Sequence, residues 1–301
     1  MSERKWVRRS LRQLSGDLSE QGYQASRMTV RRLLSKQKYS LKANRKQLTG
    51  PPHPDRDRQF RYIQRVKSWF MATGRPAISV DTKKKELVGN FKNEGRVWCQ
   101  QAAKVNAHDF RQDALGRAVP YGIYDLTHNQ GYVYVGTSAE TAEFAVDAIA
   151  HWWQDEDRPA FLHEDRLLIL CDAGGCNGYR LRSWKLHLQT QLADRLGIEV
   201  MVCHYPTGAS KWNPIEHRLF SYVSLNWSGQ PLRSFETLLG YIRDTTTSSG
   251  LKVKAHLIER DYASGLKVSD EEMATLNLVR RPVCPQWNYI IKPRDVALCG
   301  C

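Results

Sequence analysis

Three acidic residues, far apart in the sequence, each occupy a position that would expose a carboxylate at the edge of a folded domain. Asp81 follows the apolar run at residues 77–80, and Asp172 follows the apolar run at residues 167–171. Both runs are typical of buried strands, and ligand sites of α/β proteins commonly lie beyond strand ends. Glu216 falls in the first turn of an expected helix. Because Mg²⁺ prefers carboxylate and other oxygen ligands, the three acids together predict a divalent-metal site.

Each acid also has a purely structural interpretation. An aspartate after a strand often caps a turn. Asn213 and Pro214 have the residue types of an N-cap and a first helical position, which would make Glu216 a capping residue of its own helix. Three glycines follow Asp172: Gly174, Gly175 and Gly178. They favour the functional interpretation, because glycines let a phosphate backbone approach closely.

The net charge of the chain lies in its first quarter. Residues 1–75 hold 19 of the 45 Lys and Arg residues but only 5 of the 31 Asp and Glu residues. The whole net charge of +14 therefore falls in this segment. A block this basic attracts a polyanion and releases counterions from each phosphate that it neutralises. The alternative is a basic segment that only aids solubility.

The same block has the pattern of two short helices. Apolar residues at positions 11, 14 and 18 predict one helix at residues 10–20, and Gly22 ends the pattern. Ser26 has the residue type of an N-cap for a second helix. Two such helices predict a helix-turn-helix, in which the second helix enters the major groove of DNA. That helix would present Arg27, Thr29, Arg31, Arg32 and Lys36.

The rest of the chain predicts an α/β domain. A proline cluster at residues 51–54 is typical of a linker. Strands are predicted at residues 77–80, 87–91, 121–126, 132–136, 167–171 and 198–203, and helices at 141–153, 181–196 and 214–227. We therefore expect a small all-α helix-turn-helix region at 1–50, a basic linker and helix at 51–75, an α/β domain at 76–291, and a tail of unknown role at 292–301.

Composition excludes several other classes. No run approaches the roughly 20 apolar residues that span a membrane, and the basic N-terminus lacks the apolar core of a signal peptide. Seven cysteines without framework spacing are typical of reduced thiols, which predicts a cytoplasmic protein. The pairs Cys171 with Cys176 and Cys203 with His204 match no zinc-finger spacing.

Three blocks of the sequence resemble the signature blocks of bacterial insertion-sequence transposases of the DDE class, specifically the ISAzo-like group. They are VDTKKKELVGNF at residues 80–91, DAGGCNG at 172–178 and SKWNPIEHRLF at 210–220. The similarity extends over about residues 10–291. It implies an RNase H-like fold, a mixed sheet flanked by helices, with Asp81, Asp172 and Glu216 as the catalytic and metal-binding triad. Relatives usually carry more residues upstream, and residues 292–301 lie outside the resemblance.

Phosphodiester transfer must stabilise charge around phosphorus while the attacking and leaving oxygens lie in line. Two Mg²⁺ ions about 3.5–4 Å apart, with Mn²⁺ able to substitute, would do this. Asp81 would bridge both ions, and Asp172 and Glu216 would each bind one. Water would first cleave at the transposon end, and the freed 3′-hydroxyl would then attack target DNA.

The implied partner is DNA, both the terminal inverted repeats and the target, with self-association of the protein on DNA in the bacterial nucleoid. No membrane and no small-molecule substrate are implied. Further candidates for DNA contacts are Lys83, Lys84, Lys85, Ser210 and Lys211, and Trp212 is a candidate for stacking on an unpaired base. Two alternatives stay open: an inactive transposase-derived DNA-binding protein or repressor, and a metal nuclease with the same core that cuts without joining.

Overall fold

The computed structural model describes residues 9–41, 53–155 and 158–294. The chain divides into two compact units, residues 1–50 and residues 51–301. Within the described ranges, no helix is long and apolar enough to cross a membrane. Most of the tail expected at 292–301 lies outside the described residues.

The first unit contains a pair of helices, α1 (Leu11–Glu20) and α2 (Arg27–Lys36). Ser10 caps α1 in a capping box with Gln13, so each residue satisfies a backbone N–H of the other. The Ser26 hydroxyl accepts the Thr29 N–H at 3.2 Å at the start of α2. The two helices predicted from the sequence are therefore confirmed, including the role of Ser26 as an N-cap.

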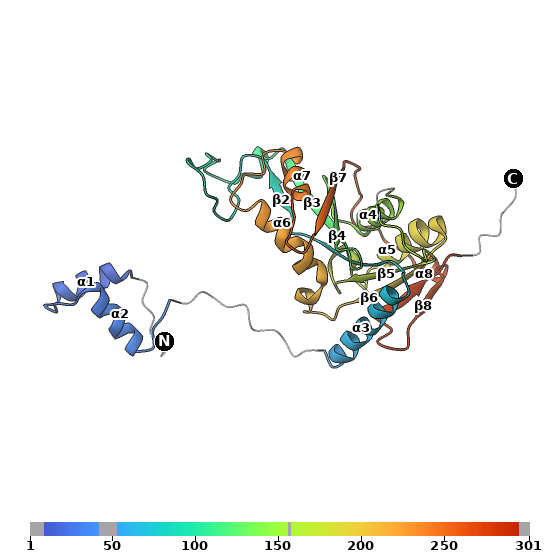
Figure 1. Cartoon of the computed structure of the whole chain (residues 1–301), viewed down its shortest axis with the longest axis horizontal. Coiled ribbons are helices and arrows are strands. Elements are labelled where there is room, and N and C mark those ends of the chain that lie inside the picture. Colours follow the sequence, from blue (N-terminus) through green and yellow to red (C-terminus); the bar gives the residue numbers. More distant parts are fainter. Residues whose placement is uncertain (1–8, 42–52, 156–157, 295–301) are drawn as a thin grey trace. The chain divides into compact units, whose positions relative to one another are not determined.

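The second unit is built on one mixed sheet (Figure 1). Its strands are β1 (Ala77–Thr82), β2 (Glu86–Val88), β3 (Gly116–Asp125), β4 (Gln130–Gly136), β5 (Arg166–Cys171), β6 (Glu199–His204), β7 (Lys252–Ile258), β8 (Leu278–Arg280) and β9 (Asn288–Ile291). They lie in the order β7-β4-β3-β1-β5-β6-β9-β8, with β2 beside β3.

The centre of this sheet has the RNase H-like arrangement. β4, β3 and β1 are antiparallel neighbours, and β5 and β6 continue the sheet parallel to β1. The predicted fold is therefore confirmed. The sequence interpretation had not predicted the outer strands β7, β8 and β9.

Helices cover both faces of the sheet (Figure 1). They are α3 (Arg56–Ala72), α4 (Ala142–Gln154), α5 (Arg182–His187), α6 (Ser221–Asn226), α7 (Phe235–Arg243) and α8 (Asp270–Ala274). The π-helical segment η3 (Leu188–Asp194) continues α5, and the π-helical segment η5 (Glu216–Phe220) leads into α6. There are also three short 3-10 helices: η1 (Arg111–Asp113), η2 (Gly175–Asn177) and η4 (Ser210–Trp212). The side chains of α4 and α5 pack on one face, and those of α3, α6 and α7 pack on the other.

Helix α3 lies in the segment expected to be a basic linker and helix, and it is part of the core of the second unit. Tyr62, Ile63 and Phe70 are buried in a cluster with apolar residues of β5 and β6. Gln59 and Asn288 exchange hydrogen bonds through their side-chain amides, at 2.8 and 2.6 Å. A buried amide pair of this kind favours one position of the helix on the sheet, because a shift of the helix would leave buried polar groups unpaired. Helix α3 is therefore fixed to the sheet.

Candidate active site

The sheet brings the first two acids to the same edge. Val80 of β1 pairs with Cys171 of β5 in parallel register. Asp81, still within β1, and Asp172, the residue after β5, each follow one of these paired residues, so they lie at neighbouring positions, as expected for parallel strands. Both are half-buried, and so is Glu216, the first residue of η5.

The three carboxylates influence one another electrostatically. Burial, and after it the negative charge of Asp172, raises the pKa of Asp81 to about 8, with a smaller contribution from Glu216. Burial also raises the pKa of Asp172 to about 6, and the charge of Glu216 acts in the same direction. Like charges gathered in a partly desolvated place favour protonation unless a cation compensates them. The charge of Glu216 thus acts on both aspartates, which stand at the neighbouring ends of β1 and β5.

The donor set fits a hard divalent cation. In the described ranges, no group of three or more His, Cys, Asp or Glu side chains is placed so that it could hold a metal ion by itself. Mg²⁺ does not require such a cage, because it keeps several waters and binds one or two carboxylates together with substrate phosphates. Asp81, Asp172 and Glu216 offer only oxygen ligands, and a bound cation would offset the burial and the repulsion that raise the two aspartate pKa values.

Asn213 joins the segments that carry the three acids. Its side-chain amide donates to the Asp172 carboxylate and to the Val80 carbonyl, each at 3.1 Å. The Ser79 hydroxyl donates to the Asn213 side-chain oxygen at 2.5 Å and accepts the backbone N–H of Ile215 at 3.1 Å. Asn213 thus stands at the expected N-cap position, with Pro214 as the first helical residue and its carbonyl accepting the Glu216 N–H. Its side chain does not cap the helix: the Ser79 hydroxyl accepts the Ile215 N–H instead, and the Asn213 amide turns towards Asp172.

A glycine on the neighbouring strand lets this helix lie against the sheet. Gly122 of β3 pairs directly with Asp81. A Cβ at Gly122 would collide with the Phe220 ring and stand 2.9 Å from the side chain of Ile215. The absence of a side chain at this position therefore sets how closely η5, with Glu216, approaches Asp81.

His204 supports the backbone of Asp172. Its Nδ1 lies 2.9 Å from the Asp172 carbonyl oxygen, and its Nε2 lies 3.0 Å from the Tyr289 hydroxyl. Because the indole N–H of Trp184 donates to the Tyr289 oxygen at 3.0 Å, the tyrosine can donate to Nε2 while Nδ1–H donates to Asp172. Burial lowers the pKa of His204 to about 4, which keeps this ring neutral. Both ring nitrogens are thus engaged in positioning.

An open hollow of about 500 Å³ lies beside Asp172. It is lined by Asp172, Ala173, Gly174, Gly175, Gly178, Tyr179, Arg180, Leu181, Pro206, Thr207, Gly208 and Ser210. No atom lies within 4 Å of the point where a Cβ of Gly174 would stand. The glycine loop after Asp172 therefore leaves space for a phosphate group, as the sequence suggested.

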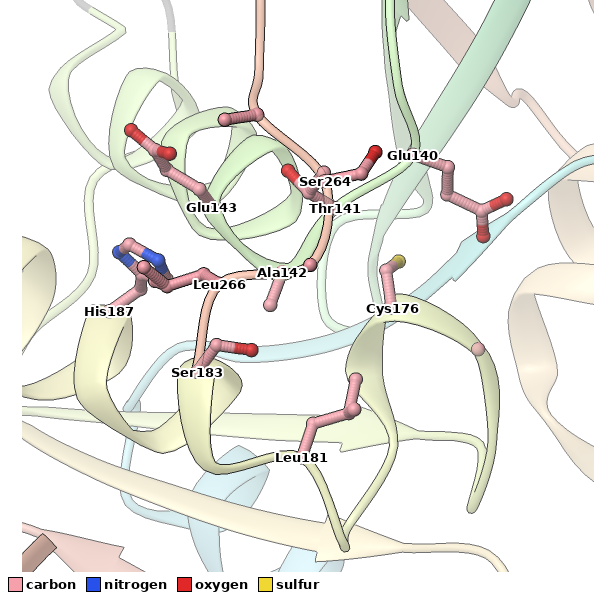
Figure 2. A pocket seen from close by; sticks show the side chains of 13 residues that line it. Glu140, Thr141, Ala142, Glu143, Cys176, Leu181, Ser183, His187, Ser264 and Leu266 are labelled. Atoms are coloured by element: carbon pink, nitrogen blue, oxygen red, sulfur yellow. The ribbon is translucent and has the colours of Figure 1, made fainter. Parts of the chain in front are cut away.

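A second hollow, of about 380 Å³, has two glutamates in its lining (Figure 2). Glu140 and Cys176 lie at one side of it, and Glu143 and His187 lie at the other. Glu140 forms an ion pair with Lys85, at 2.7 Å. Two glutamates in its lining disfavour a phosphate, so the hollow beside Asp172 is the better candidate for a nucleic-acid strand.

The candidate DNA contacts of α2 are accessible to different degrees. Arg27, Arg31, Arg32 and Lys36 are exposed, whereas Thr29 is half-buried. The Thr29 hydroxyl lies 3.0 Å from the Ser26 hydroxyl at the helix start. The four cations can therefore meet a partner directly, and Thr29 also contributes to the cap.

The three lysines after Asp81 differ in their surroundings. Lys83 pairs with Glu86 at 3.5 Å and lies 4.5 Å from the Trp227 ring centre. Lys85 is the partner of Glu140 described above, while Lys84 is exposed. Thus Lys84 is the lysine of this run that faces solvent.

The two candidate residues in the loop before Glu216 both face solvent. Ser210 and Lys211 are exposed. The Lys211 ammonium lies 4.2 Å from the ring centre of Trp212, which is 43% exposed. A cation and an indole at the rim of the site are suited to contacts with a nucleic-acid strand.

Comparison with known proteins identifies the family. Residues 1–293 match a family model described as Rhodopirellula transposase DDE domain. No curated protein matches the chain. Solved structures that resemble it include the Mos1 transposase paired-end complex with left transposon end (16% identity, TM-score 0.42) and the mariner Mos1 paired end complex with Mg (14% identity, TM-score 0.47). Each alignment covers 80% of this chain and 72% of the other. The family match spans nearly the whole sequence and confirms the resemblance to DDE-class transposases, so this chain belongs to the transposase DDE domain family.

Proposed function

We propose that this transposase cleaves DNA at the ends of a mobile element and joins the freed 3′-hydroxyl to target DNA, with Asp81, Asp172 and Glu216 as its metal ligands. The main support is the electrostatic coupling of the three carboxylates, which come from β1, the end of β5 and η5. A structural cap at each position would explain any one acid, but not the electrostatic interaction among them.

Two divalent cations, Mg²⁺ or Mn²⁺, would supply the Lewis acidity that activates the attacking hydroxyl and stabilises the leaving oxygen. The protein's part is to hold and orient. Asn213 keeps one oxygen of Asp172 turned towards β1, and His204 fixes the backbone of Asp172. The glycine loop beside Asp172 leaves room for the scissile phosphate, and Lys211 is placed to contact a neighbouring phosphate.

Recognition of the element's ends falls to the first unit. The exposed cations of α2 and the strongly basic composition of residues 1–75 favour insertion of α2 into the major groove at the terminal inverted repeats. Copies of the protein then assemble on DNA to bring two ends together. Chromosomal DNA as substrate places this activity in the bacterial cytoplasm at the nucleoid.

A strand-transfer assay tests the proposal. Full-length protein is incubated with duplexes that carry the sequences flanking its own coding region, with a supercoiled target plasmid and Mg²⁺ or Mn²⁺. We expect nicked ends and joined products. The variants D81N, D172N and E216Q should each lose both, whereas E236Q, which alters an exposed acid of α7, should retain both.

The outcomes separate the three candidate functions. Joined products support the transposase mechanism. Cutting without joining points to a metal nuclease. Specific binding of the flanking sequences without any cutting, under both metals, points to a transposase-derived repressor and contradicts the proposed chemistry.

A further inference from the structure

Helix α3 carries three arginines on one exposed face. Arg58, Arg61 and Arg65 are spaced i, i+3 and i+7, so they follow one another along the same side of the helix, and all three are exposed. The opposite side, with Ile63 and Phe70, is buried against the sheet, and Tyr62 lies between this side and the arginines. We call the three arginines the arginine stripe.

The stripe borders a hollow of about 310 Å³, whose other lining residues are Tyr62 and Val283. A fourth guanidinium lies beside it, because Arg281 Nε donates to the Tyr62 hydroxyl at 3.3 Å. The Arg65 guanidinium lies 5.5 Å from the Tyr62 ring centre. Three guanidinium groups thus line one surface depression and a fourth lies beside it, an arrangement that suits phosphate oxygens.

The acids near the stripe compensate its charge only in part. Asp57 pairs with Arg61, and Asp55 lies 4.0 Å from Arg58. Residues 53–72 contain five Lys and Arg against these two aspartates. Exposed ion pairs typically contribute only about 0–1 kcal/mol, so phosphates can replace these carboxylates at little cost.

The start of α3 is held against the loop that leads to Glu216. The Arg56 guanidinium lies 4.6 Å from the Trp212 ring centre, and the ring of Phe60 packs against Trp212 at 5.8 Å. Further along, Gln59 donates to the His204 carbonyl at 2.9 Å. The stripe therefore keeps a fixed position relative to the three carboxylates, because both belong to the same packed unit.

We infer that the arginine stripe is a second DNA-binding surface, which holds the phosphate backbone of duplex DNA on the unit that carries the carboxylate site. This rests on the proposed function, since it assigns the place of the same substrate. The stripe rises about 10 Å along α3, and duplex DNA carries one charge per about 1.7 Å of its axis, so several phosphates can face it. Phosphate, rather than an acidic polypeptide, is favoured because guanidinium groups gathered at one depression match phosphate oxygens, and the same unit carries the proposed phosphodiester site.

The test compares two triple variants of the full-length protein that remove equal charge. R58A/R61A/R65A removes the stripe, and R195A/K252A/K267A removes three exposed cations elsewhere on the same unit. Binding of a duplex of about 30 base pairs is measured in EDTA at several salt concentrations. In a plot of the logarithm of the binding constant against the logarithm of the salt concentration, each lost phosphate contact lowers the steepness of the slope by about 0.9. The slope of the stripe variant should therefore be less steep by about 2 to 3, and that of the control by less than about 0.5.

Folding and specificity are checked in parallel. Both variants should keep the melting temperature of the wild type, and R58K/R61K/R65K should recover most of the slope because the charges are restored. In the cleavage assay, the stripe variant should raise KM for DNA and leave the rate at saturating DNA within about twofold, since no group at the reacting atoms has changed.

Equal salt slopes for the stripe variant and the control would overturn the inference. It would also be overturned if loss of the stripe weakened the binding of polyglutamate but left the binding of the duplex unchanged. Failure of the proposed chemistry is a separate result: the wild type would then not cleave, while the difference in salt slope would persist.

Discussion

The side-chain amide of Asn213, three residues before Glu216, donates a hydrogen bond to the carboxylate of Asp172 over 3.1 Å. The same nitrogen donates to the carbonyl of Val80, the residue before Asp81. One buried amide therefore contacts the segments of all three acids. Positions that are remote in the sequence are aligned through this single group.

Replacement of Asn213 by alanine should reduce both stability and catalysis. The Val80 carbonyl and the Ser79 hydroxyl would lose a buried partner, which costs about 1–3 kcal/mol. Loss of the group that orients a metal ligand typically lowers activity by roughly 10–100-fold. Urea unfolding and single-turnover cleavage measure the two effects. N226A, which alters an exposed asparagine of α6, is the matched control and should change neither by a comparable amount.

The variant D81N should make the metal-free protein more stable at alkaline pH. The pKa of Asp81 is raised from 3.8 to about 8, so the folded state retains a proton that the unfolded state releases in this window. Stability contributed by that proton is present below about pH 4 and is lost as pH rises towards 8. The difference in melting temperature between D81N and the wild type should therefore shift in favour of D81N from pH 5 to pH 8. The shift is about 2–4 °C for each kcal/mol of unfolding free energy that the wild type loses. A constant difference across this range would contradict the argument.

Removal of divalent metal should abolish cleavage, and the apparent affinity for Mg²⁺ should increase with pH. Protons and the cation compete for Asp81 and Asp172, whose pKa values are raised to about 8 and about 6. Below these values, each displaced proton weakens binding roughly tenfold per pH unit. Mg²⁺ titrations of the melting temperature between pH 6 and pH 8.5 measure this trend. D81N should show a weaker Mg²⁺-induced shift, and an equal shift would exclude Asp81 as a ligand.

Replacement of Gly122 by alanine should push the helix of Glu216 away from the sheet. The added methyl group collides with Phe220 and with Ile215. Overpacking of this kind costs about 1–3 kcal/mol, and a shift of the ligand should lower the cleavage rate beyond the loss of folded protein. G240A in α7 is the control, because no atom lies within 4 Å of its new Cβ and the substitution should stabilise a helix by up to about 1 kcal/mol. Equal activity of both variants would show that the helix position does not matter.

Several elements were predictable from local patterns. The apolar strands β1 and β5, the β3–β4 hairpin, and the helices α1, α2 and α4 have hydrophobic periods that report on their own burial. The outer strands β7, β8 and β9 were not predicted. β8 and β9 are only three and four residues long, and β7 mixes charged with apolar residues. Such strands exist because a neighbouring strand offers hydrogen bonds, which no local pattern encodes.

The sequence by itself determined which acids could bind metal, because residue type and strand pattern are local properties, and the family blocks fixed the choice of Asp81, Asp172 and Glu216. Only the tertiary structure decided that the Asn213 side chain serves Asp172 instead of capping its helix, that Lys83 is held by Glu86 and Trp227, and that α3 packs on the sheet. Each of these outcomes depends on contacts between residues that are far apart in the sequence: a hydrogen-bond partner for Asn213, a charged and an aromatic partner for Lys83, and an apolar surface for α3. Those contacts are settled only when the strands and helices have come together.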